Sequence, residues 1–401
     1  MIPRLISHRI NEAIQNQLSF FLLGPRQTGK TTLVTNSYKS LPHLAYNLME
    51  TGQRIRFEKD PSLIIAEVLA SQHSYFFIDE VQKVPEILDN IQILIDREQK
   101  TFALTGSSAR KLKRKGINLL PGRVLSIRMD PLVYPEYHPQ ITHQSHLKRI
   151  LKYGELPRIF SLVQEGKEQL AEELLYAYVT TYLEEEIRAE SLVRKIGAFS
   201  KFLKIAAEES GKIVSLRSLS QDLGIPHQTI ADYYRILEDC LIVEKIESLT
   251  PSQERGKVVK APKFIFFDLG VTNASAEVLG SGDFHAEYWG RIFEQWVGLT
   301  LLRYMRANNL RGKLFYWRDY SGREVDWIVE FQGQWIPIEV KWGENLKSVH
   351  HQHLDYFIKS HPEKAKKGLI VFTGTHSRKI TENISAVTSD EFLDRIFKGL
   401  L

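Results

Sequence analysis

The chain has 401 residues, 43% of them hydrophobic and 25% charged, and this length and composition predict an ordinary globular protein with two or three domains. Its 53 lysines and arginines exceed its 48 acidic residues by five, a weakly basic balance that permits contact with nucleic acid without demanding it. The single cysteine, Cys240, excludes an internal disulfide framework and any cysteine-based zinc site, and no apolar stretch approaches the roughly 20 residues of a membrane span.

The first predicted strand, Leu18–Leu23, runs straight into a phosphate-binding loop. The sequence GPRQTGKTT fits the pattern G-x-x-x-x-G-K-[ST] and opens a helical stretch, which is the context that the motif requires. Backbone N–H groups of such a loop and the following helix N-terminus favour an anion. We therefore expect a nucleoside triphosphate here, with Lys30 at the outer phosphates and the Thr31 hydroxyl on Mg²⁺. The expected binding residues are Gly24, Pro25, Arg26, Gln27, Thr28, Gly29, Lys30, Thr31 and Thr32.

A second predicted strand supports the prediction of a nucleotide site. Tyr75–Ile78 is an unbroken apolar run, as expected of a strand buried on both faces of a parallel sheet, and it ends in Asp79 and Glu80. Ligands of open α/β sheets bind at the carboxyl ends of the strands. We expect Asp79 to hold Mg²⁺, mostly through water, and Glu80 to orient or polarise the attacking water.

The remaining elements of residues 1–138 alternate in the same way and predict a parallel sheet covered by helices. We expect strands over His43–Leu48 and Thr101–Thr105 and a helix over Val81–Asp96. Thr105 and Ser107 are candidates for sensing the terminal phosphate, although turn chemistry alone explains them too. The densest basic run, RKLKRK at residues 110–115, fits either a phosphate-backbone contact or a solvated face.

Residues 139–250 predict a helical region that contains a winged helix. Glu165–Arg188 is one long amphipathic pattern, and Leu216–Leu237 has helix-turn-helix spacing with the turn at Gly224. A strand over Cys240–Ile246 would complete the winged helix. Two interpretations stay open: DNA binding through His227, Gln228 and Thr229, or a lid packed on the nucleotide domain, favoured because Asp232, Glu238 and Asp239 would be repelled by phosphates.

Residues 251–401 predict a self-standing α/β unit. Its expected elements are strands at 264–267, 313–317 and 369–372, a hairpin of 324–331 and 334–341 across Gly333, and helices at 287–307 and 349–360.

This unit carries a second possible active site. Alternation along a strand places Glu339 and Lys341 on one face, and a hairpin would bring Asp326 to that face. Glu294, on the preceding helix, would add a third carboxylate. Three acids can hold Mg²⁺, with Asp326 and Glu339 as its ligands, and a neighbouring lysine can stabilise charge, which suits phosphodiester cleavage. A solvated strand edge is the alternative. For His350, His351 and His353 a surface helix competes with metal binding.

Five segments together resemble a known family. GPRQTGKTT, FFIDEVQKVP, LTGSSARKL, LPGRV and DPLVYPEY resemble a bacterial and archaeal AAA-type P-loop ATPase family with a C-terminal domain of unknown function, similar to the PD-(D/E)XK restriction-endonuclease-like fold. EVDWIV and IPIEVKWG extend the resemblance. It implies ATP and Mg²⁺ as cofactors and raises Arg123 as an arginine finger that acts across a subunit boundary or after a domain rotation.

The fold expected for the whole chain is therefore α/β: a P-loop parallel sheet, a helical winged-helix region and a restriction-endonuclease-like domain. The expected catalytic residues are Glu80, Arg123, Glu294, Asp326, Glu339 and Lys341. The function expected first is an ATPase whose nucleotide state controls a nuclease-like domain acting on DNA. An ATP-driven switch or scaffold with an inactive nuclease-like domain and a DNA-binding regulator are the alternatives. We expect a cytoplasmic protein, because Met1–Arg4 lacks the basic-then-apolar pattern of a secretion signal. We expect no membrane partner, and homo-oligomers are possible.

Overall fold

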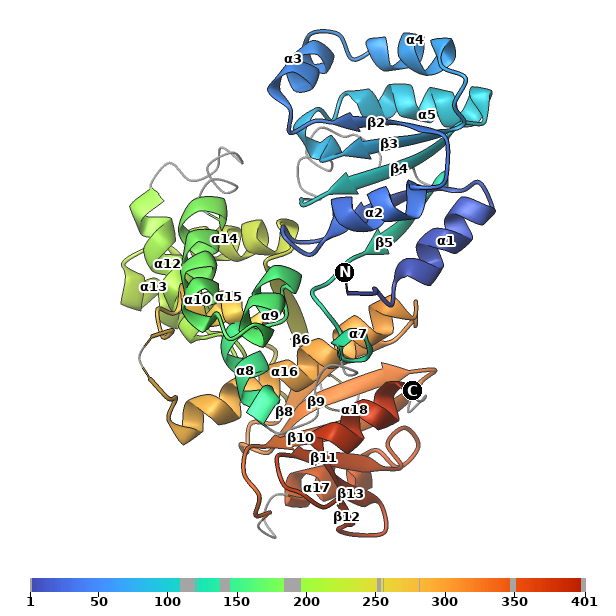
Figure 1. Cartoon of the computed structure of the whole chain (residues 1–401). Coiled ribbons are helices and arrows are strands. Elements are labelled where there is room, and N and C mark those ends of the chain that lie inside the picture. The colour runs from blue at the N-terminus through green and yellow to red at the C-terminus, as the bar shows by residue number, and fades with distance from the viewer. Residues whose placement is uncertain are drawn as a thin grey trace. The chain divides into compact units, whose positions relative to one another are not determined.

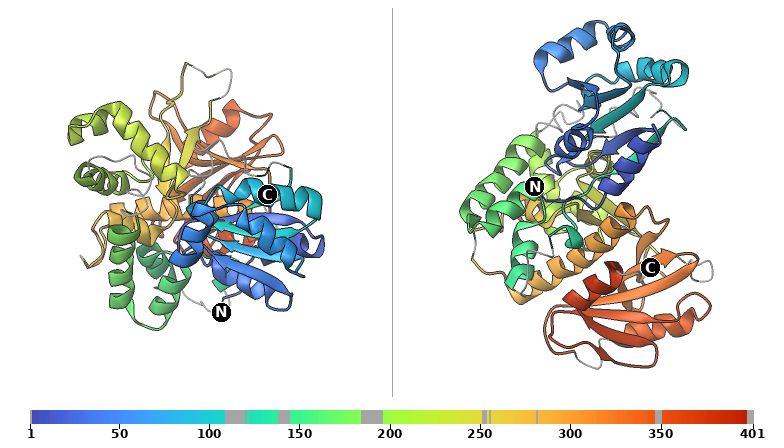
Figure 2. Two further views of the ribbon diagram at one scale, coloured as in Figure 1. Left: turned by 90° about the horizontal axis from the view of Figure 1, so that it is seen from above. Right: turned by 45° about the vertical axis from the view of Figure 1, so that its right-hand side comes forward.

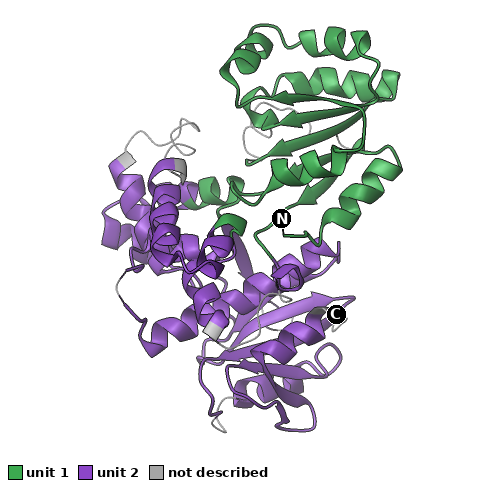
Figure 3. Cartoon of the chain, in the orientation of Figure 1, with its two compact units in different colours: residues 1–132, 156–158, 234–242 green, residues 133–155, 159–233, 243–401 purple. Residues whose placement is uncertain are grey.

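A computed structural model describes residues 2–108, 120, 122–137, 145–183, 196–250, 254, 256–280, 282–346 and 351–397 (Figure 1). These residues form two compact units (Figure 3). The first comprises residues 1–132, 156–158 and 234–242, and the second comprises residues 133–155, 159–233 and 243–401. The basic run at residues 110–115 lies outside the described residues.

The first unit contains a five-stranded parallel sheet in the order β2-β3-β4-β1-β5. Its strands are β1 (Ser19–Leu23), β2 (His43–Asn47), β3 (Tyr75–Asp79), β4 (Thr101–Gly106) and β5 (Val124–Arg128). The predicted strands are confirmed. The edge strand β5 was not predicted, because its alternation of exposed and buried residues is short and weak.

Helices cover both faces of this sheet (Figure 1). The helices are α1 (Ser7–Gln15), α2 (Lys30–Tyr38), α3 (Thr51–Lys59), α4 (Leu63–Ala70) and α5 (Ile87–Glu98). One apolar core joins the sheet to α3, α4 and α5, and another joins it to α1 and α2. The helix predicted from Val81 begins instead at Ile87, after a 3₁₀ turn over Val81–Lys83. Pro85 explains the difference, because proline lacks the N–H that a helix interior needs.

The second unit begins with a helical region. Its helices are α7 (Tyr134–Tyr137), α8 (Ser145–Tyr153), α9 (Pro157–Gln164, shared with the first unit), α10 (Glu168–Ala177), α12 (Ile196–Glu208), α13 (Leu216–Leu223), α14 (His227–Asp239, also shared with the first unit) and α15 (Leu269–Ser275). The predicted helix-turn-helix spacing is confirmed, since α13 ends at Gly224 and α14 follows Pro226. The long helix predicted over Glu165–Arg188 starts at Glu168 and becomes π-helical over Tyr178–Leu183, and its remainder lies outside the described residues.

A mixed eight-stranded sheet forms the rest of the second unit, in the order β12-β13-β11-β10-β9-β8-β6-β7. Its strands are β6 (Val243–Ser248), β7 (Lys263–Phe266), β8 (Lys313–Arg318), β9 (Glu324–Phe331), β10 (Gln334–Lys341), β11 (Gly368–Phe372), β12 (Arg378–Lys379) and β13 (Ile384–Thr388). Strand β6, expected within a winged helix, pairs with β7 and β8 and so belongs to this sheet. The predicted domain boundaries at residues 138 and 250 stay predictions.

Three helices pack on this sheet: α16 (Ala286–Ala307), α17 (Gln352–Ser360) and α18 (Ser389–Phe397). Helix α17 covers one face, where Leu354, Phe357 and Ile358 join the core, and α16 and α18 contact each other on the opposite face (Figures 1 and 2). The predicted β9–β10 hairpin is confirmed. Its two turn residues, Gln332 and Gly333, have φ values of 50° and 77°, as in the two-residue turns whose twist matches that of the strands.

The close packing of α16 on the sheet gives a testable difference between two glycines of the same helix. A Cβ atom added at Gly298 would lie 2.7 Å from Cζ2 of Trp327, whereas one added at Gly290 would lie 3.7 Å from Cβ of Trp342. We expect Gly298→Ala to lower the free energy of unfolding by about 1–3 kcal/mol. Gly290→Ala, the matched control, should leave it unchanged or raise it by up to about 1 kcal/mol.

Urea unfolding followed by tryptophan fluorescence measures this difference, because all six tryptophans lie between residues 289 and 342. Equal stability of the two variants would contradict the packing described for α16.

Candidate functional site

The loop between β1 and α2 is built for close backbone approach. A Cβ atom at Gly24 would lie 2.2 Å from the backbone oxygen of Met129, so a side chain at this position cannot fit without moving the backbone. Gly29 immediately precedes α2 with a φ of 96°, a conformation that favours glycine. The two glycines therefore hold the chain in a turn that ends on the unpaired N–H groups of a helix N-terminus.

Lys30 lies within this loop. Its side chain is buried, and Nζ donates hydrogen bonds to the backbone oxygens of Gly24 at 2.8 Å and Pro25 at 3.0 Å. The Thr28 hydroxyl also donates to the Pro25 oxygen, at 2.9 Å. A buried ammonium bonded to neutral carbonyls is well placed for an anionic group, because a phosphate would be a stronger acceptor.

A residue that sequence analysis missed holds the loop from outside. Arg4 donates through Nη1 to the Thr28 oxygen at 2.6 Å and through Nη2 to the Asp130 oxygen at 2.7 Å and the Pro131 oxygen at 3.2 Å. Arg4 lies 20 residues before the motif, and no pattern in the sequence connects it to the loop.

Thr31 and Asp79 come together as predicted. The Thr31 hydroxyl lies 3.0 Å from each Asp79 carboxylate oxygen. Burial raises the pKa of Asp79, and hydrogen bonds from Thr105 and Thr31 oppose that shift. A hydroxyl and a carboxylate are ligand types that Mg²⁺ prefers. The residues present therefore fit the predicted ion: Thr31 and Asp79 would hold it, and it would supply charge neutralisation for phosphates.

Glu80 has a strained backbone and a fixed side chain. Its φ of 56° lies in the left-handed region, which is uncommon for residues other than glycine and is typical of functional sites. The Glu80 N–H donates to Thr105 Oγ1 at 3.0 Å. Glu80 Oε2 accepts hydrogen bonds from Ser107 Oγ, at 3.2 Å, and from Gln82 Nε2. This network orients one carboxylate that can polarise a water molecule.

The strand order explains how Thr105 and Ser107 reach Asp79 and Glu80. Strand β4 lies between β1 and β3, so its carboxyl end falls between the loop and the acids. Thr105 also donates to Asp79 Oδ1. Gln82, which sequence analysis missed, is buried and donates to Ser107 Oγ at 2.9 Å.

Arg123 lies at the amino-terminal ends of the strands β1 and β5, away from the carboxyl ends where the loop and the acids lie. It precedes β5, whose first residue, Val124, pairs with Ser19 at the start of β1, while the loop follows the end of β1. Arg123 Nε contacts both carboxylate oxygens of Asp96 at 2.8 Å. Arg123 thus lies at the opposite end of the strands from the loop, and its predicted role across a subunit boundary or after a domain rotation stays a prediction.

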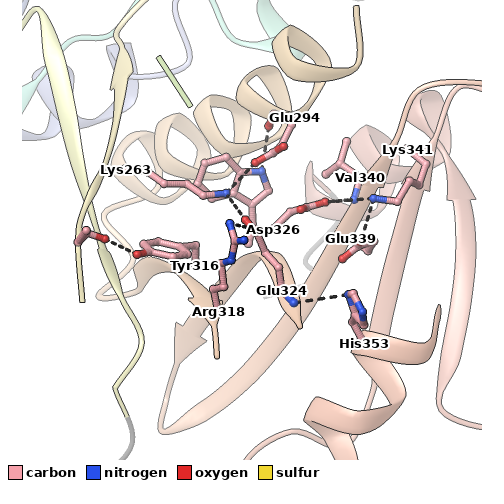
Figure 4. Close-up of polar contacts among 12 residues, drawn as sticks. Lys263, Glu294, Tyr316, Arg318, Glu324, Asp326, Glu339, Val340, Lys341 and His353 are labelled. Atoms are coloured by element: carbon pink, nitrogen blue, oxygen red, sulfur yellow. Dashed lines mark hydrogen bonds and ion pairs between the residues drawn. The ribbon is translucent and has the colours of Figure 1, made fainter. Parts of the chain in front are cut away.

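The second unit contains the other predicted site (Figure 4). We call Lys263, Glu294, Glu324, Asp326, Glu339 and Lys341 the acid–lysine cluster.

Strands β9 and β10 bring three predicted residues together. Trp327 pairs with Ile338, so the preceding Asp326 and the following Glu339 share a face. Lys341 Nζ lies 2.6 Å from Glu339 Oε1 and 3.8 Å from Asp326 Oδ2. Asp326 Oδ2 also accepts a hydrogen bond from the Val340 N–H at 2.7 Å.

Glu294 pairs with a lysine that sequence analysis missed. Lys263 is 2% exposed, and its Nζ lies 2.9 Å from Glu294 Oε1 and 3.0 Å from Glu324 Oε1. The same ammonium lies 5.1 Å from the ring centroid of Tyr316 and 5.3 Å from that of Trp327. A lysine at the start of the apolar run KFIFF is the only sequence signal for it.

The charges of this cluster are strongly coupled. Burial raises the pKa of Glu294 to about 7, with Lys263 opposing the shift and Asp326 adding to it. Burial also raises the pKa of Glu339 well above its usual value, and the charge of Asp326 adds to the shift. For Lys341, burial lowers the pKa, but Asp326 and Glu339 outweigh it and the net shift is upward. The two lysines thus neutralise part of the acidic charge, but the pKa values of Glu294 and Glu339 remain raised.

This neutralisation bears on the predicted metal ligands. Among the described residues, no group of three or more His, Cys, Asp or Glu side chains is arranged to hold a metal ion. One feature does fit a cation, because Glu339 Oε2 is buried without a hydrogen-bond partner. His353 Nδ1 lies 3.5 Å from the Glu324 N–H, and His350 lies outside the described residues.

Three family matches cover most of the chain. Residues 16–138 match the AAA domain family, residues 144–281 match a domain of unknown function (DUF8612), and residues 289–392 match another (DUF4143). None of these descriptions names a nuclease.

Relatives of similar length exist in mycobacteria and Haemophilus. The uncharacterized proteins Mb2031c of Mycobacterium bovis and Rv2008c of Mycobacterium tuberculosis are each 25% identical over 390 residues, which is 96% of this chain and 83% of each relative. An uncharacterized protein of Haemophilus influenzae is 23% identical over 344 residues, covering 79% of this chain and 80% of the relative.

Two solved structures have a distant likeness. The Walker-type ATPase PABY2304 of Pyrococcus abyssi has a TM-score of 0.49 at 14% identity, covering 69% of this chain and 96% of its own. The Orc1 protein of Aeropyrum pernix in complex with DNA has a TM-score of 0.28 at 12% identity, covering 68% and 91%. At these TM-scores neither likeness says what this chain binds.

None of the helices that the structure describes combines the length and apolar character needed to cross a membrane. The sequence match, the parallel sheet and the loop agree on one conclusion: residues 16–138 are an AAA-type P-loop ATPase domain, followed by two domains whose role is unknown.

Proposed function

We propose that this protein binds and hydrolyses ATP in a Mg²⁺-dependent reaction, and that its nucleotide state controls a C-terminal nuclease-like domain that acts on DNA. The observation that carries the ATPase part is that Lys30, the Thr31–Asp79 pair and Glu80 lie together at the carboxyl ends of β1 and β3. Lys30 would bind the outer phosphates, and Glu80 would accept the proton of the attacking water.

The nuclease-like part rests on the β9–β10 hairpin. It brings the buried Asp326 and Glu339 next to Lys341, whose side chain is 30% exposed, and two carboxylates beside a lysine suit metal-dependent phosphodiester cleavage. The unpartnered Glu339 Oε2 leaves one carboxylate oxygen able to accept a cation. Asp326 and Glu339 would hold the ion, with Lys341 stabilising charge on the phosphate.

DNA cleavage tests this part of the proposal. Purified protein is incubated with linear and supercoiled DNA, Mg²⁺ or Mn²⁺, and with or without ATP. Asp326→Ala should lower cleavage by about 100-fold or more, because it removes a metal ligand and one of the two acidic partners of Lys341. Asp355→Ala, which removes a more exposed carboxylate paired with Lys359 in the same unit, is the control and should cleave normally.

A second function is favoured by a specific observation. Lys263 and Lys341 already pair with Glu294, Glu324 and Glu339, an arrangement that suits a domain that keeps the nuclease-like fold for binding or dimerisation and has lost cleavage. The chain would then be an ATP-driven switch or scaffold. Identical DNA products from wild type and Asp326→Ala would rule out cleavage by this site and leave this second function.

A further inference from the structure

A hollow of about 620 Å³ lies in the second unit, at the amino-terminal ends of β10, β11 and β13. Gln334, Trp335 and Ile336 line it from β10, and Gly368 and Leu369 line it from β11. These strands run parallel to one another, and Glu339 and Lys341 lie toward the other end of β10. The hollow is therefore distinct from the acid–lysine cluster.

The hollow is strongly basic, and we call it the basic hollow. Five cationic side chains and one acidic side chain, Glu382, line it. The cations are Lys364, Lys366, Lys367, Lys379 and Arg395. Arg395 pairs with Glu391 on its own helix. The four lysines are exposed, and within the part of the chain that the structure describes none of them forms an ion pair.

Edge protection explains only part of this charge. Lysines on an edge strand prevent pairing with other sheets, and Lys379 of β12 is placed for that. Lys364, Lys366 and Lys367, however, lie in the segment between α17 and β11, and β11 is an interior strand paired on both sides. Their gathering at one hollow needs another reason.

One lysine is positioned by an aromatic ring. Lys364 Nζ lies 4.5 Å from the ring centroid of the buried Trp335, whose Nε1 donates to Glu330 at 3.3 Å. A cation over an aromatic face is held without having its charge cancelled. The ring therefore holds the Lys364 ammonium at the hollow without pairing it with an anion.

We infer that the basic hollow binds the phosphodiester backbone of nucleic acid. Lysine ammonium groups are hydrated point charges that contact phosphates without reading bases, so the binding is sequence-independent. The inference rests on the proposed function in its choice of DNA.

Binding is tested with the full chain, without ATP or divalent metal, by fluorescence anisotropy of a labelled DNA duplex between about 50 and 200 mM salt. The test variant carries Lys366→Gln and Lys367→Gln. The control carries Lys204→Gln and Lys212→Gln, which remove the same charge from two lysines paired with Glu277 and Glu209. We expect the test variant to bind roughly tenfold or more weakly, with a slope of log K against log salt reduced by about 2. The control should bind like wild type.

Other outcomes overturn the inference in distinguishable ways. Equal losses of duplex affinity in the test and control variants would show that binding depends on the net charge of the protein and not on the basic hollow. If the test variant binds duplex as wild type does, the DNA binds elsewhere and the proposed function stands. If wild type binds no duplex, both this inference and the DNA-cleaving part of the proposed function are wrong. Tripolyphosphate binding that is lost in the test variant, without any duplex binding, would assign the hollow to a free polyphosphate. Unchanged ATP hydrolysis by the test variant is the check that it is folded.

Discussion

Lys30→Ala is expected to abolish ATP binding at concentrations that saturate the wild type. Lys30 Nζ is buried among the carbonyls of its own loop, and a charged hydrogen bond to phosphate contributes about 1.5–3 kcal/mol. Two such contacts correspond to a weakening of 100-fold or more at about 1.4 kcal/mol for each factor of ten. Titration calorimetry with ATP and Mg²⁺ measures the change directly.

The control for this prediction is Lys39→Ala, which removes an exposed lysine just beyond the other end of α2. It should bind ATP as wild type does. Because Lys30 also bonds two loop carbonyls, circular dichroism must show that Lys30→Ala is folded. Undiminished ATP binding by folded Lys30→Ala would contradict the assignment of this loop to phosphate.

Glu80→Gln is expected to bind ATP normally and to hydrolyse it about 10²–10⁴-fold more slowly. Glutamine keeps the shape of Glu80 and an oxygen that can accept from Gln82 and Ser107, so the local fold should survive. It cannot take a proton from water, and general base catalysis contributes about this much. Steady-state hydrolysis should show a lower kcat at little changed KM.

Glu86→Gln is the matched control, since Glu86 is exposed and lies six residues later on the chain. Its hydrolysis should equal that of wild type. If Glu80→Gln hydrolyses ATP at the wild-type rate, another residue must activate the water.

The nucleotide-binding unit could be predicted well because its signals are local. In each case a strand is followed at once by its functional residues: the phosphate-binding loop comes directly after Leu23, and the acids Asp79 and Glu80 come directly after the apolar run Tyr75–Ile78. The start of α5 was misplaced although Pro85 was visible in the sequence.

The second unit shows where such prediction stops. Strand β6 has an apolar pattern that suits a winged helix or a large sheet equally, and its pairing with β8 joins residues about 70 positions apart. Lys263 and Glu294 meet only after β7 and α16 pack together. Sequence placed Asp326, Glu339 and Lys341 correctly because hairpin register depends on a short turn, but it gave no sign that a second lysine would enter the cluster.

Arg4 links the phosphate-binding loop to the segment that follows β5. The same guanidinium bonds the carbonyl of Thr28 inside the loop and the carbonyls of Asp130 and Pro131, where the chain continues beyond β5. A shift of the loop at Thr28 would therefore be opposed by the hydrogen bonds that the same side chain makes to the oxygens of Asp130 and Pro131. The N-terminal segment thereby ties the position of the loop to that of the residues that follow β5.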